Sequence, residues 1–338
     1  MIRVGILNVT GYAGAELARL VHSHPEATLV AATGRSGAGQ KLEEVFPHLW
    51  PLGLTVTDEI GESVDLVFSA LPHAASAESL LPFLREGAKV IDISADFRLR
   101  DSAVYERHYG RPHPAPELLS GAAYGLPEVT REPGDGTPLV ANPGCYAAGA
   151  LLAAAPGVAS GALQPGLVID GKSGVSGAGR ALAQDYHYAE ANDNLSAYGL
   201  AGQGHRHRPE IDQELSRLSP NHSPVTFVPH LVPMTRGILT TLYAQRNEGS
   251  GSLKGIYEEY YEGSSFVRVV DEPPSTRQVA GTNNCLIFIR EDDPSGRSIV
   301  ISVIDNLGRG AAGQAIQNMN RVFSLPETTG LDSIALYP

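Results

Sequence analysis

Residues 2–14 read IRVGILNVTGYAG, and this stretch decides the fold of the first part of the chain. Its apolar run, Ile2–Leu7, predicts a buried strand, and from Ala13 to Val21 the apolar residues repeat with the spacing of one helical face. The glycines between them permit a tight turn, and backbone N–H groups at such a helix start can hold a dinucleotide pyrophosphate. We therefore expect a cofactor site, rather than a purely structural turn, at Thr10, Gly11, Tyr12, Ala13 and Gly14.

The residues around this turn also indicate which dinucleotide binds. Asn8 precedes the turn, and Asn adopts left-handed backbone geometry more readily than most side chains. The second expected strand ends in Gly34-Arg35-Ser36, with no acidic residue to accept a hydrogen bond from a ribose 2′-hydroxyl. Because Arg35 and Ser36 suit a 2′-phosphate instead, the sequence favours NADP(H) over NAD(H).

The order of strands and helices predicts an α/β protein of two domains. In the first part, strands at 28–33, 64–71 and 90–93 and a helix at 74–85 follow the pattern of βαβ units, which indicates a Rossmann-like, doubly wound parallel sheet. Later strands at 167–170, 225–232, 238–244, 285–290 and 299–304 indicate a second, α+β domain. We expect an NADP-binding domain at 1–145, completed by a C-terminal helical segment at about 306–338, and a catalytic and oligomerisation domain at 146–305.

Composition excludes several classes of protein. The 338 residues are 42% hydrophobic and 18% charged, which is typical of a globular chain, and the net charge of −12 argues against nucleic-acid binding. No apolar run reaches the roughly 18 residues of a membrane span; the longest, at 147–155, is expected to stop at Pro156. Two cysteines and no signal-peptide pattern favour a reducing compartment, so we expect a cytoplasmic protein with no membrane association.

Asn142-Pro143-Gly144-Cys145-Tyr146 places a cysteine directly after a turn and before a helix expected at 146–155. A thiol at a helix N-terminus has a lowered pKa, and the N–H groups beside it can hold an oxyanion. This context favours a nucleophile over a buried, inert cysteine. Cys285 stands beside the apolar run 286–289, so we interpret it as structural.

Gly204-His205-Arg206-His207-Arg208-Pro209-Glu210 gathers two imidazoles, two guanidiniums and a carboxylate. His205, His207 and Glu210 are possible metal ligands, but the flanking arginines would repel a cation, so we expect no metal. Beside a cysteine nucleophile these residues suit proton transfer and anion binding, and a solvated basic loop is the alternative.

Residues 166–173, GLVIDGKS, match the letters of a P-loop. A P-loop needs a flexible loop between its glycines and a helix after the Lys-Ser pair. Here 167–170 is itself strand-like and glycine-rich sequence follows, so we expect no NTPase site.

Together these residues resemble the N-acetyl-γ-glutamyl-phosphate reductase family, within the aspartate-semialdehyde dehydrogenase superfamily. The matching segments are NVTGYAGAEL (8–17), LPH (71–73), SADFR (94–98), NPGCY (142–146), KSGVSGAGR (172–180), GHRHRPEI (204–211), VPMTRGIL (232–239), DNLGRGAAGQAIQNMN (305–320) and LPETTGL (325–331). The resemblance implies that Cys145 is the nucleophile and His205 the acid–base residue. It also implies substrate-binding roles for Arg98, Arg206, His207 and Glu210, and cofactor contacts for Pro72, Ser173, Gly174 and Asn306.

The resemblance further implies NADPH-dependent reduction of a small acyl phosphate to a semialdehyde through a cysteine thioester, in arginine biosynthesis, by a homo-oligomer (a dimer or tetramer). The relative that reduces carrier-bound aminoadipyl phosphate in lysine biosynthesis is the nearest alternative, although the acidic chain does not suit an acidic carrier. A cysteine acyl hydrolase without redox chemistry and a nucleotide sensor without turnover are alternatives of other classes.

Overall fold

The computed structural model describes residues 1–291 and 293–337, which fold into two compact units. The first unit comprises Met1–Pro127, Arg131–Gly144 and Ala311–Ser333. Of the described residues, the second comprises Glu128–Thr130, Cys145–Gly310 and 334–337. Among the helices of the described residues, none is both long enough and apolar enough to cross a membrane.

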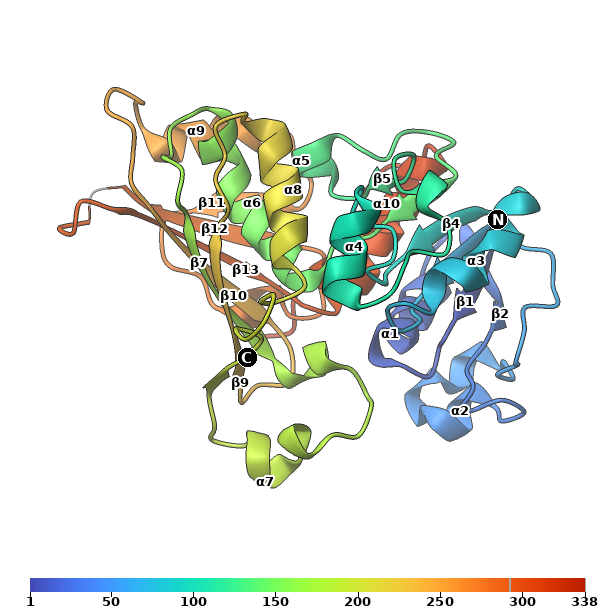
Figure 1. The fold of residues 1–338 in the computed structure, drawn as a ribbon. Coiled ribbons are helices and arrows are strands. Elements are labelled where there is room, and N and C mark those ends of the chain that lie inside the picture. Colours follow the sequence, from blue (N-terminus) through green and yellow to red (C-terminus); the bar gives the residue numbers. More distant parts are fainter. Residues whose placement is uncertain (292, 338) are drawn as a thin grey trace. The chain divides into compact units, whose positions relative to one another are not determined.

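A sheet of parallel strands forms the centre of the first unit, in the order β2-β1-β3-β4-β6-β5 (Figure 1). Its strands are β1 (Ile2–Leu7), β2 (Ala27–Ala32), β3 (Leu66–Ser69), β4 (Lys89–Asp92), β5 (Ala123–Tyr124) and β6 (Leu139–Ala141). Its helices are α1 (Tyr12–His22), α2 (Leu42–Val45), α3 (Ser76–Arg85), α4 (Ser102–Tyr109) and α10 (Gly313–Val322). Because the chain adds β2 on one side of β1 and β3 on the other, the sheet is doubly wound and the prediction is confirmed.

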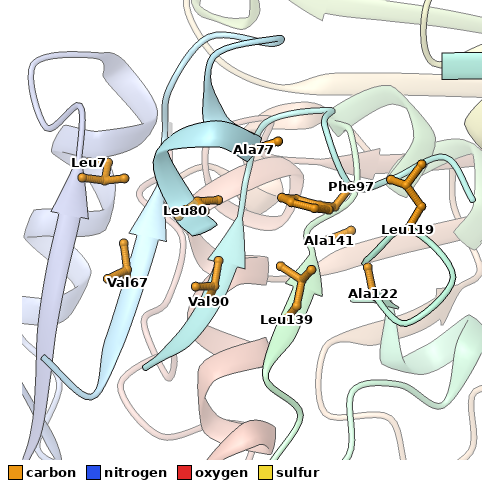
Figure 2. Close-up of a cluster of buried hydrophobic side chains, with 10 residues drawn as sticks. All are labelled: Leu7, Val67, Ala77, Leu80, Val90, Phe97, Leu119, Ala122, Leu139 and Ala141. Atoms are coloured by element: carbon orange, nitrogen blue, oxygen red, sulfur yellow. The ribbon is translucent and has the colours of Figure 1, made fainter. Parts of the chain in front are cut away.

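One buried apolar cluster of this unit lies between the strands and α3, as Figure 2 shows. Aliphatic side chains from neighbouring strands line up because parallel strands with helices on their faces must be apolar. The buried residues drawn there are Leu7, Val67, Ala77, Leu80, Val90, Phe97, Leu119, Ala122, Leu139 and Ala141. This packing fixes the strand ends, where the loops with polar residues begin.

The second unit has a mixed sheet in the order β11-β12-β13-β10-β7-β9-β8. Its strands are β7 (Val168–Gly174), β8 (Ser196–Ala197), β9 (Thr226–Val232), β10 (Ile238–Ala244), β11 (Val267–Val270), β12 (Cys285–Arg290) and β13 (Ser298–Ile304). Its helices are α6 (Cys145–Ala159), α7 (Tyr188–Ala191), α8 (Arg208–Leu218) and α9 (Leu253–Tyr260), and α5 (Pro127–Thr130) contributes its last three residues. The expected α+β character is confirmed.

Helix α6 packs on one face of this sheet, with α8 and α9 beside it (Figure 1). Helix α6 lies closest to the sheet at Gly149, where a Cβ would be 2.9 Å from Thr240 Oγ1 of β10. At the same position, Ser302 Oγ of β13 donates to the Gly149 carbonyl at 2.9 Å. On the opposite face several apolar residues of β10, β12 and β13 are only half-buried. They include Leu239, Tyr243, Leu286, Phe288, Ile299 and Ile301.

The expectation that the helix stops at Pro156 is wrong, because α6 continues to Ala159. Proline has no N–H to donate to the carbonyl four residues earlier. Here the Tyr261 hydroxyl donates to that carbonyl, of Leu152, at 2.6 Å, and Tyr257 donates to the Ala153 carbonyl at 2.5 Å. The Leu152 carbonyl, which the proline leaves without a backbone donor, is therefore satisfied by a tyrosine more than a hundred residues later in the sequence.

Candidate active site

In the first unit, the loop after β1 has the geometry expected of a dinucleotide-binding turn. Asn8 has a left-handed backbone, with φ of 67°, as predicted, and its Nδ2 donates to the Ala70 carbonyl at 2.8 Å. A Cβ at Gly14 would lie 2.2 Å from the Asn8 carbonyl oxygen, so α1 can approach the strand only with glycine there. Gly11 caps α1 without a side-chain hydrogen bond, which leaves the first-turn N–H groups open to an anion.

The loop after β2 meets this turn. Ser36 Oγ donates to Thr10 Oγ1 at 3.2 Å, and a Cβ at Gly34 would lie 2.6 Å from Thr10 Cγ2. Arg35 is exposed. Since β1 lies where the strand order reverses, these groups surround the place where doubly wound sheets bind dinucleotides, and they fit NADP(H). Pro72 belongs to the turn after β3, which also contains the Ala70 carbonyl that holds Asn8.

In the second unit, Cys145 is the first residue of α6 and is partly exposed. Its side chain lies close to Gly310, where a Cβ would come within 2.7 Å of Cys145 Cβ. Cys285, in contrast, is fully buried at the start of β12, and burial raises its thiol pKa to about 12. Because a thiolate is the reactive form, Cys285 is the inert thiol of the two.

His205 lies in a group of aromatic rings. Its ring centroid is 5.5 Å from those of Tyr146, Tyr198 and Phe227, and 4.8 Å from that of His207. The His207 backbone N–H donates to Nδ1 of His205 at 3.1 Å. Since a backbone N–H can only donate, Nδ1 must accept, and the neutral ring carries its proton on Nε2.

Two tyrosine hydroxyls connect this aromatic group to the sheet. Tyr198 donates to Tyr146 at 3.2 Å, and Tyr146 donates to the His230 carbonyl at 2.8 Å. Burial raises the pKa of both phenols well above the ordinary value, and the nearby Cys145 raises both further. Both tyrosines therefore stay neutral, and the ring of His205 packs against Tyr146, which directly follows Cys145 in the chain.

Asp305 connects several loops of this site. It is fully buried and accepts backbone N–H bonds from Gly281, Leu307 and Gly308 at 2.6, 2.8 and 3.0 Å. Arg236 donates to Oδ1 through Nε and Nη2 at 3.2 and 3.1 Å. The Asp305 carbonyl accepts from the Gly310 N–H at 2.8 Å, so this network also fixes the glycine beside Cys145.

The side-chain amide of Asn306 is held at both ends. Its Oδ1 accepts from the Gly237 N–H at 2.7 Å, and its Nδ2 donates to Ser176 Oγ at 2.9 Å. A Cβ at Gly177 would lie 3.0 Å from Ser173 Oγ and 3.6 Å from Asn306 Nδ2. The Gly174 N–H donates to the Gly237 carbonyl at 2.9 Å, so the structure brings Ser173, Gly174 and Asn306 together.

Comparisons with known proteins agree with this arrangement. Residues 3–135 match the family model described as "Semialdehyde dehydrogenase, NAD binding domain", and residues 145–306 match "Semialdehyde dehydrogenase, dimerisation domain". N-acetyl-gamma-glutamyl-phosphate reductase of Dehalococcoides mccartyi is 49% identical over 99% of both chains. The enzyme of that name from Pelotomaculum thermopropionicum is 48% identical over 100% of this chain and 99% of its own. The chain belongs to the N-acetyl-γ-glutamyl-phosphate reductase family.

Solved structures agree on the fold of this reductase-family chain. Aspartate semialdehyde dehydrogenase II of Vibrio cholerae has a TM-score of 0.70 and 16% identity, and the match covers 95% of this chain and 97% of that one. The Candida albicans aspartate semialdehyde dehydrogenase, solved with NADP, has a TM-score of 0.68 and 16% identity, with 96% and 99% coverage.

Arg98 has structural contacts in this family member. It is buried, its Nε donates to the Asn142 carbonyl at 2.8 Å, and its Nη2 donates to the Ile93 carbonyl at 2.6 Å. It therefore braces the loop that leads to Cys145, and its role in substrate binding stays a prediction. Of the other expected substrate-binding residues, Arg206 is exposed, His207 is half-buried, and Glu210 is buried in the first turn of α8.

Some residues of the site were not predicted from the sequence. Tyr198 and Phe227 surround His205, and Arg236 holds Asp305. Of these residues, only Asp305 could have been proposed from the sequence, because it directly precedes the predicted site residue Asn306. The rejection of a P-loop agrees with the structure, since Lys172 and Ser173 lie within strand β7 and only a single 3-10 turn, Val175–Ala178, follows them in place of an α-helix.

Proposed function

We propose that this protein reduces N-acetyl-γ-glutamyl phosphate with NADPH to N-acetyl-glutamate semialdehyde and phosphate, a step of arginine biosynthesis. The observation that carries the proposal is the partly exposed thiol of Cys145 at the first residue of a buried helix, directly before Tyr146, whose ring contacts that of His205. The relatives that carry this enzyme name match the chain from end to end.

In the proposed mechanism Cys145 is the nucleophile. Its thiolate attacks the γ-acyl carbon, the carbon–sulfur bond forms, and the bond to the phosphate oxygen breaks with loss of phosphate. The positive end of α6 favours the thiolate, and the N–H groups of its first turn are suited to hold the oxyanion of the acyl carbonyl. A thioester on Cys145 results, and it is far easier to reduce than a free carboxylate.

His205 is the proposed acid–base residue. Bound NADPH would supply the hydride that reduces the thioester carbonyl, which leaves an oxyanion on the carbon bonded to Cys145. The Nε2–H of His205 donates to this oxygen and shares its proton with it until the aldehyde forms and Cys145 departs as a thiolate. The Tyr146–Tyr198 pair and Phe227 keep the imidazole in one orientation.

The cofactor-binding residues lie in two groups. The first-turn N–H groups of α1 suit the pyrophosphate, and Arg35 with Ser36 suits a 2′-phosphate. Ser173, Gly174 and Asn306 are the proposed contacts of the nicotinamide end. Pro72 would complete the first group from the turn after β3.

We further propose that the protein is a homo-oligomer, a dimer or tetramer, in the cytoplasm. The half-buried apolar face of the second sheet would be covered by a second copy, in keeping with the matched dimerisation domain. A catalytic thiol needs a reducing compartment, and both cysteines are free.

A reverse-direction assay tests the proposed reaction. The enzyme is mixed with NADP⁺, phosphate and N-acetyl-glutamate semialdehyde, and in a parallel reaction with the carrier-bound aminoadipate semialdehyde. We expect phosphate-dependent NADPH formation with the first substrate. Activity only with the carrier-bound substrate would assign the lysine pathway, and hydrolysis of acyl substrates without NADP⁺ reduction would indicate a hydrolase.

A further inference from the structure

The Arg208 side chain folds back over the loop that carries His205. A Cβ at Gly204 would lie 3.9 Å from Nη1 of Arg208 and 4.0 Å from its Cζ. The backbone N–H of Arg208 donates to the His205 carbonyl at 3.0 Å. The guanidinium therefore lies beside the turn that leads into the proposed acid–base residue.

The guanidinium of Arg208 has a buried N–H that the described residues do not use. Its Nε is buried and has no hydrogen-bond partner within the described part of the chain. Arg217, on the same helix, donates instead to the buried Glu214 carboxylate at 2.7 Å. A buried N–H of a charged group without an acceptor costs more free energy than a neutral one, so Arg208 needs an explanation beyond the fold.

The surroundings of Arg208 contain the proposed reacting groups. Its loop presents His205 and His207 to the ring of Tyr146, at 5.5 and 6.0 Å between centroids, and Tyr146 directly follows Cys145. The proposed substrate carries a carboxylate and an acyl phosphate. Because the whole chain has a net charge of −12, a local cation is needed to bring such an anion to the thiol.

We propose that the Arg208 guanidinium binds an oxyanion of the acyl substrate. A planar guanidinium matches both a carboxylate and a phosphoryl group, so either end of the substrate could supply the oxyanion. Of the two arginines in the loop, Arg206 is exposed, whereas Arg208 is half-buried against Gly204. This inference rests on the proposed function, because it assigns a contact to that substrate.

The experiment compares Arg208→Gln with Arg217→Gln in the reverse reaction, with semialdehyde, phosphate and NADP⁺ each varied in turn. We expect Arg208→Gln to raise KM about ten- to hundred-fold for one anionic substrate, as for the loss of a charged hydrogen bond. A raised KM for semialdehyde identifies the carboxylate, and a raised KM for phosphate identifies the phosphoryl group. KM for NADP⁺ and the rate of Cys145 alkylation by neutral iodoacetamide should stay unchanged. Arg208→Lys should restore part of the loss.

The proposal is overturned if Arg208→Gln has the same KM for semialdehyde and the same KM for phosphate as Arg217→Gln. It is also overturned if KM for NADP⁺ rises in parallel, or if Arg208→Lys is no better than Arg208→Gln, since either result indicates a general disturbance of the fold. Failure of the proposed function gives a different result. In that case the unmutated enzyme itself shows no phosphate-dependent NADP⁺ reduction.

Discussion

The two units present their polar groups in different ways. The first unit offers mainly backbone N–H groups and small side chains, on loops at the carboxyl ends of parallel strands such as Asn8–Gly14. The second unit offers side chains with chemistry of their own, Cys145 at a helix start and His205 on a loop held by aromatic rings. The first arrangement is suited to hold a cofactor, and the second is suited to break and form covalent bonds.

This difference predicts that the two functions can be damaged separately. Substitutions in the second unit should stop acyl transfer or reduction and leave cofactor binding intact. Substitutions in the first unit should change cofactor affinity or stability and leave the thiol reactive. A variant that impairs both would show that the division is wrong.

The largest effect is expected for Cys145→Ser, which should abolish reduction and leave NADPH binding unchanged. A serine hydroxyl is protonated near neutral pH and gives an ester too unreactive for hydride attack. The reverse-direction rate and NADPH fluorescence titration measure the two properties. Cys285→Ser is the matched control and should stay active, because that thiol is buried and its pKa is raised. Near-normal turnover of Cys145→Ser would contradict the assignment.

His205→Asn should slow turnover about 10²- to 10⁴-fold, as is usual for loss of a positioned acid–base group. NADPH affinity should stay as in the unmutated protein. The pH profile of kcat should lose the limb that the imidazole supplies, which distinguishes proton transfer from a structural role. His222→Asn, on a histidine bonded to Asp212, is the control and should keep the profile. An unchanged profile in His205→Asn would remove its proposed role.

A smaller effect is expected for Arg35→Asp in the first unit. Loss of a charged contact to the 2′-phosphate should weaken NADPH roughly ten- to hundred-fold and spare NADH. Arg85→Asp makes the same change of charge on an exposed residue of α3 and should leave the preference intact. Equal use of both cofactors by the unmutated enzyme would refute the basis of this prediction.

The smallest effect concerns stability. Asp92 is fully buried at the end of β4, and burial, with the nearby Asp96, raises its pKa to about 6. The native state therefore binds a proton that the unfolded chain has released, so stability falls as pH rises from about 4 to about 6. Between about pH 4 and pH 6, the free energy of unfolding of the unmutated protein should fall by up to about 3 kcal/mol relative to that of Asp92→Asn. Parallel denaturant-unfolding curves for the two proteins at all pH values would contradict this shift.

The sequence was sufficient where local pattern and final environment agree. Ile238–Ala244 and Cys285–Arg290 form strands with the predicted bounds, because each is a short run rich in apolar, β-branched and aromatic residues. The turn at Asn8 and Gly14 was also predictable, since few residues other than Asn or Gly permit that geometry.

The sequence was insufficient where distant residues decide the outcome. Pro156 locally predicts a helix end, but the Tyr261 hydroxyl donates to the Leu152 carbonyl that the proline leaves open. Likewise, Phe227 and Asp305 contribute to the site only because the mixed sheet brings their segments beside α6 and its neighbours. No spacing in the sequence shows such contacts.

The formation of a thioester on Cys145 is the central claim, and one measurement tests it directly. The enzyme is mixed with N-acetyl-glutamate semialdehyde and NADP⁺ without phosphate. No phosphate is then present to accept the acyl group from Cys145. We predict a burst of NADPH equal to the enzyme concentration, together with a mass increase of one acyl group on the peptide that contains Cys145. No burst, or an acyl group on any other residue, would contradict the account.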